Sequence, residues 1–137
     1  MAKEVKNKTY QSTGKRKSAI AKATLYPEGK GIVRINSVFL EAIPMTISKE
    51  RIREPLTLAE NTATEVDIDV KVRGGGWQGQ TEASRLAIAR VLSNYNKKLK
   101  KVFLDYDRHL LIQDVRFKET RKPNDSKARA ARQKSYR

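Results

Sequence analysis

The chain has 137 residues, and its 30 lysines and arginines outnumber 15 aspartates and glutamates, for a formal net charge of +15. This length suits one domain with one hydrophobic core and is too short for two ordinary domains. Cysteine is absent and His109 is the only histidine, which excludes disulfides, thiolate nucleophiles and cysteine-based zinc sites. No cofactor, metal site or catalytic residue is predicted.

The positive charge predicts a polyanionic partner, because binding one relieves the self-repulsion of the free protein. Nucleic acid is the first candidate. An anionic membrane is the second, but the basic segment near residue 130 has alanines where an amphipathic helix needs bulky apolar side chains. No apolar run approaches the roughly 18 residues of a spanning helix, and the first residues, MAKEVKNKTYQ, do not resemble a signal peptide. A soluble cytoplasmic protein is therefore expected.

Residues 1–12 are polar and lysine-rich without periodicity, which predicts a flexible basic arm. A globular domain over 13–115 follows, with ordered sequence expected from about Gly14. Alternating apolar residues over 18–26 and the segment IVRI over 32–35 each predict a strand. The breakers PEGKG separate the two segments, so they are expected to pair as a hairpin.

The middle of the chain predicts a helix, a strand and a second helix. A short helix is expected over 46–58, bent or ended near Pro55. Residues 65–73 alternate strictly between apolar and charged side chains, which indicates a strand with one face in the core. Apolar residues spaced three and four apart predict a long helix over 81–98. A further helical turn is expected in KVFLDY and a last strand in HLLIQD.

The composition changes at Arg116. Residues 116–137 contain nine basic and two acidic residues, so about a sixth of the chain holds seven of the fifteen net positive charges. Such a segment buries too little apolar surface to offset the entropy of ordering, and it is expected to become ordered only on a partner. It is interpreted as an extended basic tail that penetrates RNA, with a solubilising or targeting run as the plainer alternative.

The glycine-rich segment GGGWQGQ, residues 74–80, lies between the strand and the long helix. Three interpretations remain open for it: a tight turn with Gly79 allowing close helix packing, an RNA phosphate contact in addition to the turn, and a small-nucleotide site. The Walker and dinucleotide fingerprints are both unmet. Trp77 either stacks on a base or covers the helix end, and packing is slightly favoured.

Other charged residues also allow more than one interpretation. Lys15, Arg16 and Lys17 precede a strand, where they either grip successive phosphates or form a solvated basic edge. The presence of three basic segments in one small protein favours RNA. His109 is interpreted as structural, since no nucleophile lies near it in sequence. Asp67 and Asp69 are expected to balance neighbouring basic residues rather than bind a metal ion.

Five stretches in order resemble the universal small-subunit ribosomal protein nine family, called ribosomal protein S sixteen in eukaryotes. They are TGKRKSAIAKA, GKGIVRIN, GGGWQGQTEASRLAIAR, YDRHLLIQDVRFKETRKP and KARAARQKSYR, and they extend from about Gly14 to Arg137. The ending QKSYR resembles the archaeal and eukaryotic branch. The resemblance implies a single small α/β (α+β) domain of the ribosomal protein S-five second-domain-like type, with a mixed sheet and packed helices. It also implies a structural protein, not an enzyme.

The resemblance further implies a place in the head of the small ribosomal subunit, with rRNA, P-site tRNA and neighbouring head proteins as partners and no membrane or small-molecule substrate. Contact with the tRNA anticodon loop would fall to Arg137, Tyr136 and Lys134. The rRNA-binding residues would be Lys15, Arg16, Lys17, Arg73, Gly74, Gly75, Gly76, Arg116, Lys118, Arg121, Lys122, Lys127, Arg129 and Arg132. Residues 123–126 depart from the glycine-rich stretch usual in this branch. A small nucleotide-binding enzyme using residues 74–79 is the alternative.

Overall fold

The computed structural model of the protein describes residues 8–124 and 127–129. One mixed sheet has the strand order β1-β2-β5-β3-β4. Within it β3 runs parallel to β5, and the other neighbouring strands are antiparallel. The strands are β1 (Tyr10–Arg16), β2 (Ala19–Pro27), β3 (Val33–Ile35), β4 (Val38–Phe39) and β5 (Val66–Arg73). This architecture confirms the predicted α+β fold with a mixed sheet.

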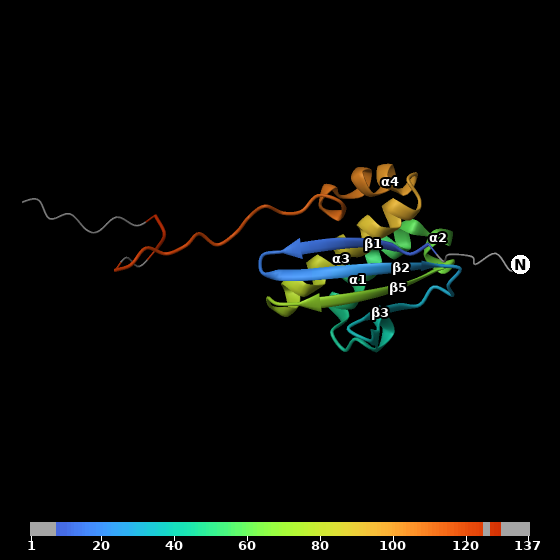
Figure 1. The fold of residues 1–137 in the computed structure, drawn as a ribbon, viewed down its shortest axis with the longest axis horizontal. Helices are drawn as coiled ribbons and strands as arrows, with labels where there is room; N and C mark the ends of the chain where they lie inside the picture. The colour runs from blue at the N-terminus through green and yellow to red at the C-terminus, as the bar shows by residue number, and fades with distance from the viewer. Residues whose placement is uncertain (1–7, 125–126, 130–137) are drawn as a thin grey trace, which may run out of the picture.

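The two long helices pack on one face of the sheet and lie behind it in Figure 1. The helices are α1 (Thr46–Ala59), α2 (Asn61–Thr64), α3 (Trp77–Tyr95) and α4 (Leu99–Tyr106), with 3-10 turns η1 (Leu40–Ala42) and η2 (Arg108–Leu110). Within the described residues, the opposite face of β1, β2 and β5 carries no helix. One side of the sheet is therefore core, and the other meets solvent.

The core forms where β2 and β5 meet α3. The alternating residues of β5 from Val66 to Val72 are buried, as are the alanines of β2. Small side chains let the helix approach closely: a Cβ built on Gly14 would lie 2.2 Å from the backbone oxygen of Ala83. The predicted inward faces of both strands are confirmed, and Gly14 fixes the distance between β1 and α3.

The predicted hairpin between residues 18–26 and 32–35 is wrong. β2 instead pairs with β1 and β5, and β3 pairs with β4 and β5. Regular structure begins at Tyr10, earlier than the expected start near Gly14 and inside the segment predicted as an arm. The polar residues of β1 hid this strand, because an edge strand with one solvated face needs few apolar side chains.

Both long helices differ from their predicted bounds, and α3 ends at Tyr95, before the expected end at residue 98. α1 continues through Pro55 to Ala59, and the buried proline ring packs in the core. α3 begins at Trp77, four residues before the expected start, so that Gly79 lies within the helix. The glycine-rich segment is thus a turn of Gly74 and Gly75 followed directly by helix. Asn36 and Ser37 form a turn between β3 and β4, and the predicted helical segment in KVFLDY is confirmed.

The last predicted strand, over HLLIQD, is also wrong, because the chain forms η2 and then runs without regular structure. Asp107 caps η2 by accepting the backbone N–H of His109, and Leu110 is the buried anchor. Beyond it, the Arg90 guanidinium donates to the backbone oxygens of both Leu111 and Thr13. This side chain joins the segment to β1 in place of strand pairing.

Candidate nucleic-acid interface

A hairpin tip presents three consecutive cations at one end of the sheet. β1 and β2 pair as far as Arg16 and Ala19, so only Lys17 and Ser18 form the turn. Lys17 has a φ of 53°, in the left-handed region, and is exposed. Lys15 and Arg16 end β1 immediately beside it. The paired strands and the short turn therefore fix the backbone positions of the predicted residues 15–17.

The glycine turn lies directly against this hairpin tip. Gly74 has a φ of +75°, and a Cβ built on it would lie 2.7 Å from the backbone oxygen of Ser18. Gly75 has a φ of +68°, and its Cβ would meet the side chain of Ala19. Both positions need glycine for conformation and for space. Two of the stretches predicted to bind rRNA, residues 15–17 and 73–76, are thus brought together, because the sheet register also places Arg73 beside Ile20.

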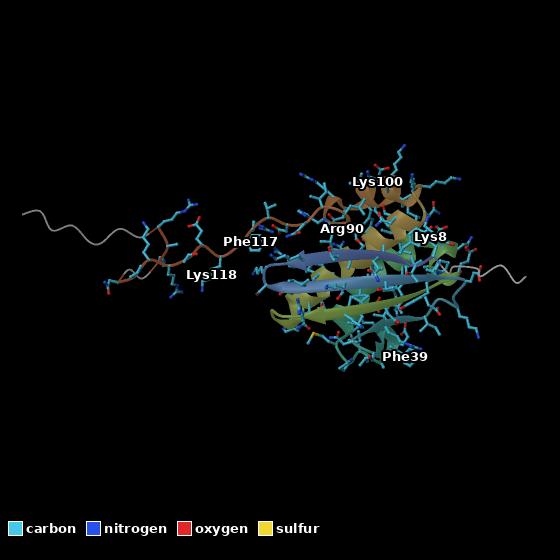
Figure 2. All side chains as sticks on the ribbon, viewed as in Figure 1. Lys8, Phe39, Arg90, Lys100, Phe117 and Lys118 are labelled. Carbon is cyan, nitrogen blue, oxygen red and sulfur yellow. The ribbon has the colours of Figure 1, made fainter. Side chains whose placement is uncertain are left out.

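The base of the tail joins the same cluster. The Lys15 ammonium lies 5.1 Å from the ring centre of Phe117, within the range of a cation–π contact. A groove at this point is lined by Arg16, Lys17, Ser18, Arg116, Phe117 and Lys118. Figure 2 shows Phe117 and Lys118 where the chain leaves the domain. We call Lys15, Arg16, Lys17, Arg116 and Lys118 the hairpin–tail cluster.

Asp114 orients two arginines of the hairpin–tail cluster. Its carboxylate lies 2.8 Å from Arg16 Nη1, in a geometry that gives this atom no hydrogen bond, and 2.7 Å from Arg116 Nη2. The side chain and backbone N–H of Arg116 hold the pKa of Asp114 well below its usual range. The carboxylate therefore stays ionised at neutral pH and arranges the guanidiniums before any phosphate arrives.

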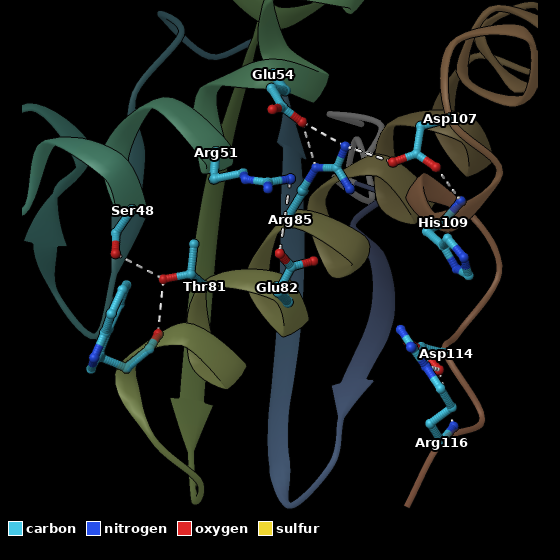
Figure 3. Close-up of polar contacts among 11 residues, drawn as sticks. Ser48, Arg51, Glu54, Thr81, Glu82, Arg85, Asp107, His109, Asp114 and Arg116 are labelled. Carbon is cyan, nitrogen blue, oxygen red and sulfur yellow. Dashed lines mark hydrogen bonds and ion pairs between the residues drawn. The ribbon is translucent and has the colours of Figure 1, made fainter.

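A cleft of about 320 Å³ adjoins the cluster and contains a second, internal charge network. Buried Arg85 donates to Glu54 and to Asp107, with nitrogen–oxygen distances of 2.6 and 3.0 Å (Figure 3). Burial alone would lower the pKa of Arg85, but both carboxylates raise it. Because its donors face these carboxylates, Arg85 joins α1, α3 and η2 and offers little to an external anion.

Asp67 was predicted to balance neighbouring basic residues, but its carboxylate has a different role. Its Oδ1 accepts the backbone N–H groups of Ile32 and Lys30, at 2.9 and 2.8 Å, and these bonds lower its pKa. Asp67 therefore holds the loop between β2 and β3. Within the described residues, no group of three or more acidic or histidine side chains is placed to hold a metal ion. Nor, in that part of the chain, does any helix have the length and apolar character to cross a membrane.

The described tail, over 116–124 and 127–129, has no helix or strand, and its basic side chains are exposed. Figure 1 shows it leading away from the domain. Arg129 Nε donates to Glu119 at 2.9 Å, an ion pair within the tail. Arg121, Lys122 and Lys127 are exposed in this segment. The predicted residues Arg132, Lys134, Tyr136 and Arg137 lie outside the described residues.

Sequence reasoning missed three side chains at this end of the molecule. Phe117 supports Lys15, Arg90 fixes the base of the tail, and Arg51 lines the cleft. No one-dimensional pattern distinguishes them from other surface residues, because each role depends on a contact distant in sequence. Packing was slightly favoured for Trp77, but the structure does not bury it: the residue is 53% exposed.

The sequence is similar to known ribosomal proteins. A family model described as ribosomal protein S9/S16 matches residues 14–137. The small ribosomal subunit protein uS9 of Thermoplasma acidophilum is 48% identical over 128 residues, which cover 92% of this chain and 98% of that protein. The protein of the same name from Methanothrix thermoacetophila is 45% identical over 132 residues, covering 95% and 99%. The chain therefore belongs to the ribosomal protein S9/S16 family, whose members are structural proteins of the small ribosomal subunit.

Proposed function

We propose that the protein binds small-subunit rRNA through the hairpin–tail cluster, and that its tail continues this contact along the RNA. The observation that carries the proposal is the meeting of three stretches distant in sequence: the basic residues 15–17, Arg73 with the glycine turn over 74–76, and the base of the tail at 116–118. Cations gathered on a rigid turn match the closely spaced phosphates of RNA. Guanidiniums add paired donors to phosphate oxygens, and lysines add point charges.

The tail extends this surface. Arg121, Lys122, Lys127 and Arg129 are exposed beyond the cluster, and Arg132 follows them in sequence. A segment with little apolar surface becomes ordered when phosphates neutralise its charge. We infer that these residues line an rRNA passage. The Arg129–Glu119 pair is exposed, so exchanging Glu119 for a phosphate costs little.

The family resemblance supports a second contact, with P-site tRNA. Arg137, with Tyr136 and Lys134, is proposed to reach the phosphates of the anticodon loop. An arginine supplies donors to phosphate oxygens and a tyrosine supplies a stacking surface. The alternative of a nucleotide-binding enzyme has no observation in its favour. Gly74 and Gly75 pack against the hairpin tip, and Gly79, which lies within α3, packs against Ala19 of β2.

The rRNA contact is tested by neutralising two cluster lysines in the variant K17Q/K118Q. Each phosphate contact raises the logarithm of the binding constant by about 0.7 to 0.9 for every tenfold decrease in salt concentration. A variant that lacks one contact loses this gain between about 1 M and 0.1 M salt. Filter binding to a transcript of the small-subunit head rRNA at about 0.1 M salt should therefore show a roughly 25-fold or larger loss. The matched control K100Q/K101Q removes two exposed lysines of α4, away from the cluster (Figure 2). Equal affinities for the two variants would contradict the proposal.

The tRNA contact is tested by removing residues 135–137. Small subunits assembled with this variant should contain it in normal amounts but bind P-site tRNA more weakly, because only the proposed tRNA contact is lost. The measurements are co-sedimentation with small subunits and equilibrium binding of tRNA to the purified subunits. Loss of assembly with normal tRNA affinity would show that these residues serve as an rRNA anchor only.

A further inference from the structure

Two lysines face each other on the helix-free side of the sheet. The register pairs Lys22 of β2 directly with Lys71 of β5, and both side chains are exposed. Like charges opposite one another on adjacent strands destabilise a sheet. In the described part of the chain, neither lysine has a carboxylate within 4.0 Å. The fold therefore tolerates a repulsion that a bound polyanion would relieve.

The next row toward the hairpin tip adds two more cations. Lys15 of β1 and Arg73 of β5 flank Ile20 of β2 on the same side of the sheet. Rows two residues apart lie about 7 Å from one another, and neighbouring strands lie about 4.8 Å apart. Four cations thus cover three adjacent strands. We call Lys15, Lys22, Lys71 and Arg73 the sheet-face cations.

Negative charge on this side gathers at the other end of the strands. Asp69 lies in register with Arg34, and Asp67 holds the loop at Lys30 and Ile32 with its carboxylate. Neither forms a salt bridge with the sheet-face cations within the described residues. The end nearer the hairpin tip is therefore strongly positive.

A groove crosses the same face and ends at an aromatic ring. Its lining includes Lys22 and Lys71 at one end, Asp69 in the next row of the register, and Tyr26, which is 42% exposed, at the other end. Tyr26 is the only large apolar side chain of β1, β2 and β5 that is exposed. A protein interface normally has an apolar core, which this face lacks. Two lysines at one end of the groove and an exposed ring two rows away instead suit RNA, whose phosphates need cations and whose bases stack on aromatic side chains.

We propose that the helix-free face of β1, β2 and β5 is a second RNA-binding surface, where Lys22 and Lys71 bind phosphates and Tyr26 stacks on a base or ribose. Lys15 and Arg73 connect it to the hairpin–tail cluster. This inference rests on the proposed rRNA binding and extends it from the hairpin–tail cluster to the sheet face at Lys22 and Lys71. It adds Lys22, Lys71 and Tyr26 to the RNA-contacting residues.

The test compares the full-length variant K22Q/K71Q with K100Q/K101Q, which removes the same charge from α4. The probe is a transcript of the small-subunit head rRNA, measured by filter binding over a salt series. K22Q/K71Q should bind roughly 25-fold or more weakly at about 0.1 M salt, with a salt slope shallower by about 1.5. Its melting temperature should equal or exceed that of the unmodified protein, because the Lys22–Lys71 repulsion is gone. The variant K22R/K71R keeps the charges and should retain binding.

The outcomes separate this inference from the proposed function. If K17Q/K118Q loses affinity but K22Q/K71Q binds like the control, the sheet face is not an RNA surface and rRNA binding stands. If the unmodified protein does not bind the transcript, both proposals fail. If K22Q/K71Q binds RNA normally but co-sediments poorly with small subunits, the face contacts a protein and the RNA assignment is overturned.

Discussion

Replacing Gly14 by alanine should lower the free energy of unfolding by about 3 kcal/mol, at the upper end of overpacking effects. The added Cβ would lie 2.2 Å from the backbone oxygen of Ala83 and 2.7 Å from the backbone nitrogen of Ala87. Both atoms belong to α3, so β1 and the helix must separate as whole elements. Thermal unfolding followed by circular dichroism should show a melting temperature lower by roughly 10–15 °C.

Gly76→Ala provides the matched control for this prediction. A Cβ at Gly76 meets nothing within 4 Å, and its φ of −93° is accessible to any residue. Because Gly76 is the N-cap of α3, where alanine is less favourable than glycine, the control should lose about 0.5 to 1 kcal/mol, well below the loss expected for Gly14→Ala. A Gly14→Ala protein as stable as the control would mean that β1 and α3 are not in close contact. The position of the hairpin–tail cluster would then need revision, since β1 carries two of its residues.

The alternation of side chains predicted the central strands well and their partners poorly. The inward faces of β2 and β5 follow directly from apolar residues at every second position. Pairing depends instead on contacts between distant segments. β5 lies between β2 and β3 in the sheet, although thirty residues separate it from the end of β3 at Ile35. A rule that pairs neighbouring strands therefore chose the wrong hairpin, because the true partner of β2 begins in polar sequence at Tyr10.

Apolar runs were ambiguous near the end of the domain. His109 to Ile112 has the composition of a strand, but a single residue, Leu110, fills the core while Ile112 is 40% exposed. At the end of α4 the backbone N–H of Asp107 donates to the Phe103 oxygen, and at the start of η2 its carboxylate accepts a hydrogen bond from the His109 N–H. Such capping depends on local geometry that periodicity does not reveal. At the edge of β1, Arg90 donates a hydrogen bond to the backbone oxygen of Thr13, which is 77 residues away in sequence.

The candidate site was predicted as separate basic segments, and the fold joins them. Residues 15–17 and 73–76 were both selected from sequence, but their contact follows from glycine conformations at Gly74 and Gly75. The sheet-face cations were harder to find, since Lys22 and Lys71 belong to different strands and meet only through the register. Family membership confirms the predicted location on the ribosome of the cytoplasm. The tail beyond residue 129 stays a prediction.

Cations that hold the fold together differ in their surroundings from cations that are proposed to bind RNA. Arg85 is buried between Glu54 and Asp107, and its donors point into the protein. Lys17 and Lys118 are exposed and line an open groove. Positive charge alone does not identify a phosphate-binding residue. Within the described residues, Lys17 and Lys118 form no ion pair with a carboxylate, and this property distinguishes them from Arg85.

The most direct measurement is the salt dependence of rRNA binding by the unmodified protein. Neutralising six to ten phosphates predicts that affinity for the head rRNA transcript falls by about 10³ to 10⁵ between 50 and 200 mM salt. The physical reason is the release of condensed counterions, which is less favourable as bulk salt rises. Filter binding across this range gives the slope of log affinity against log salt. A slope of about −5 or steeper would agree with the account, whereas a slope near zero would contradict it.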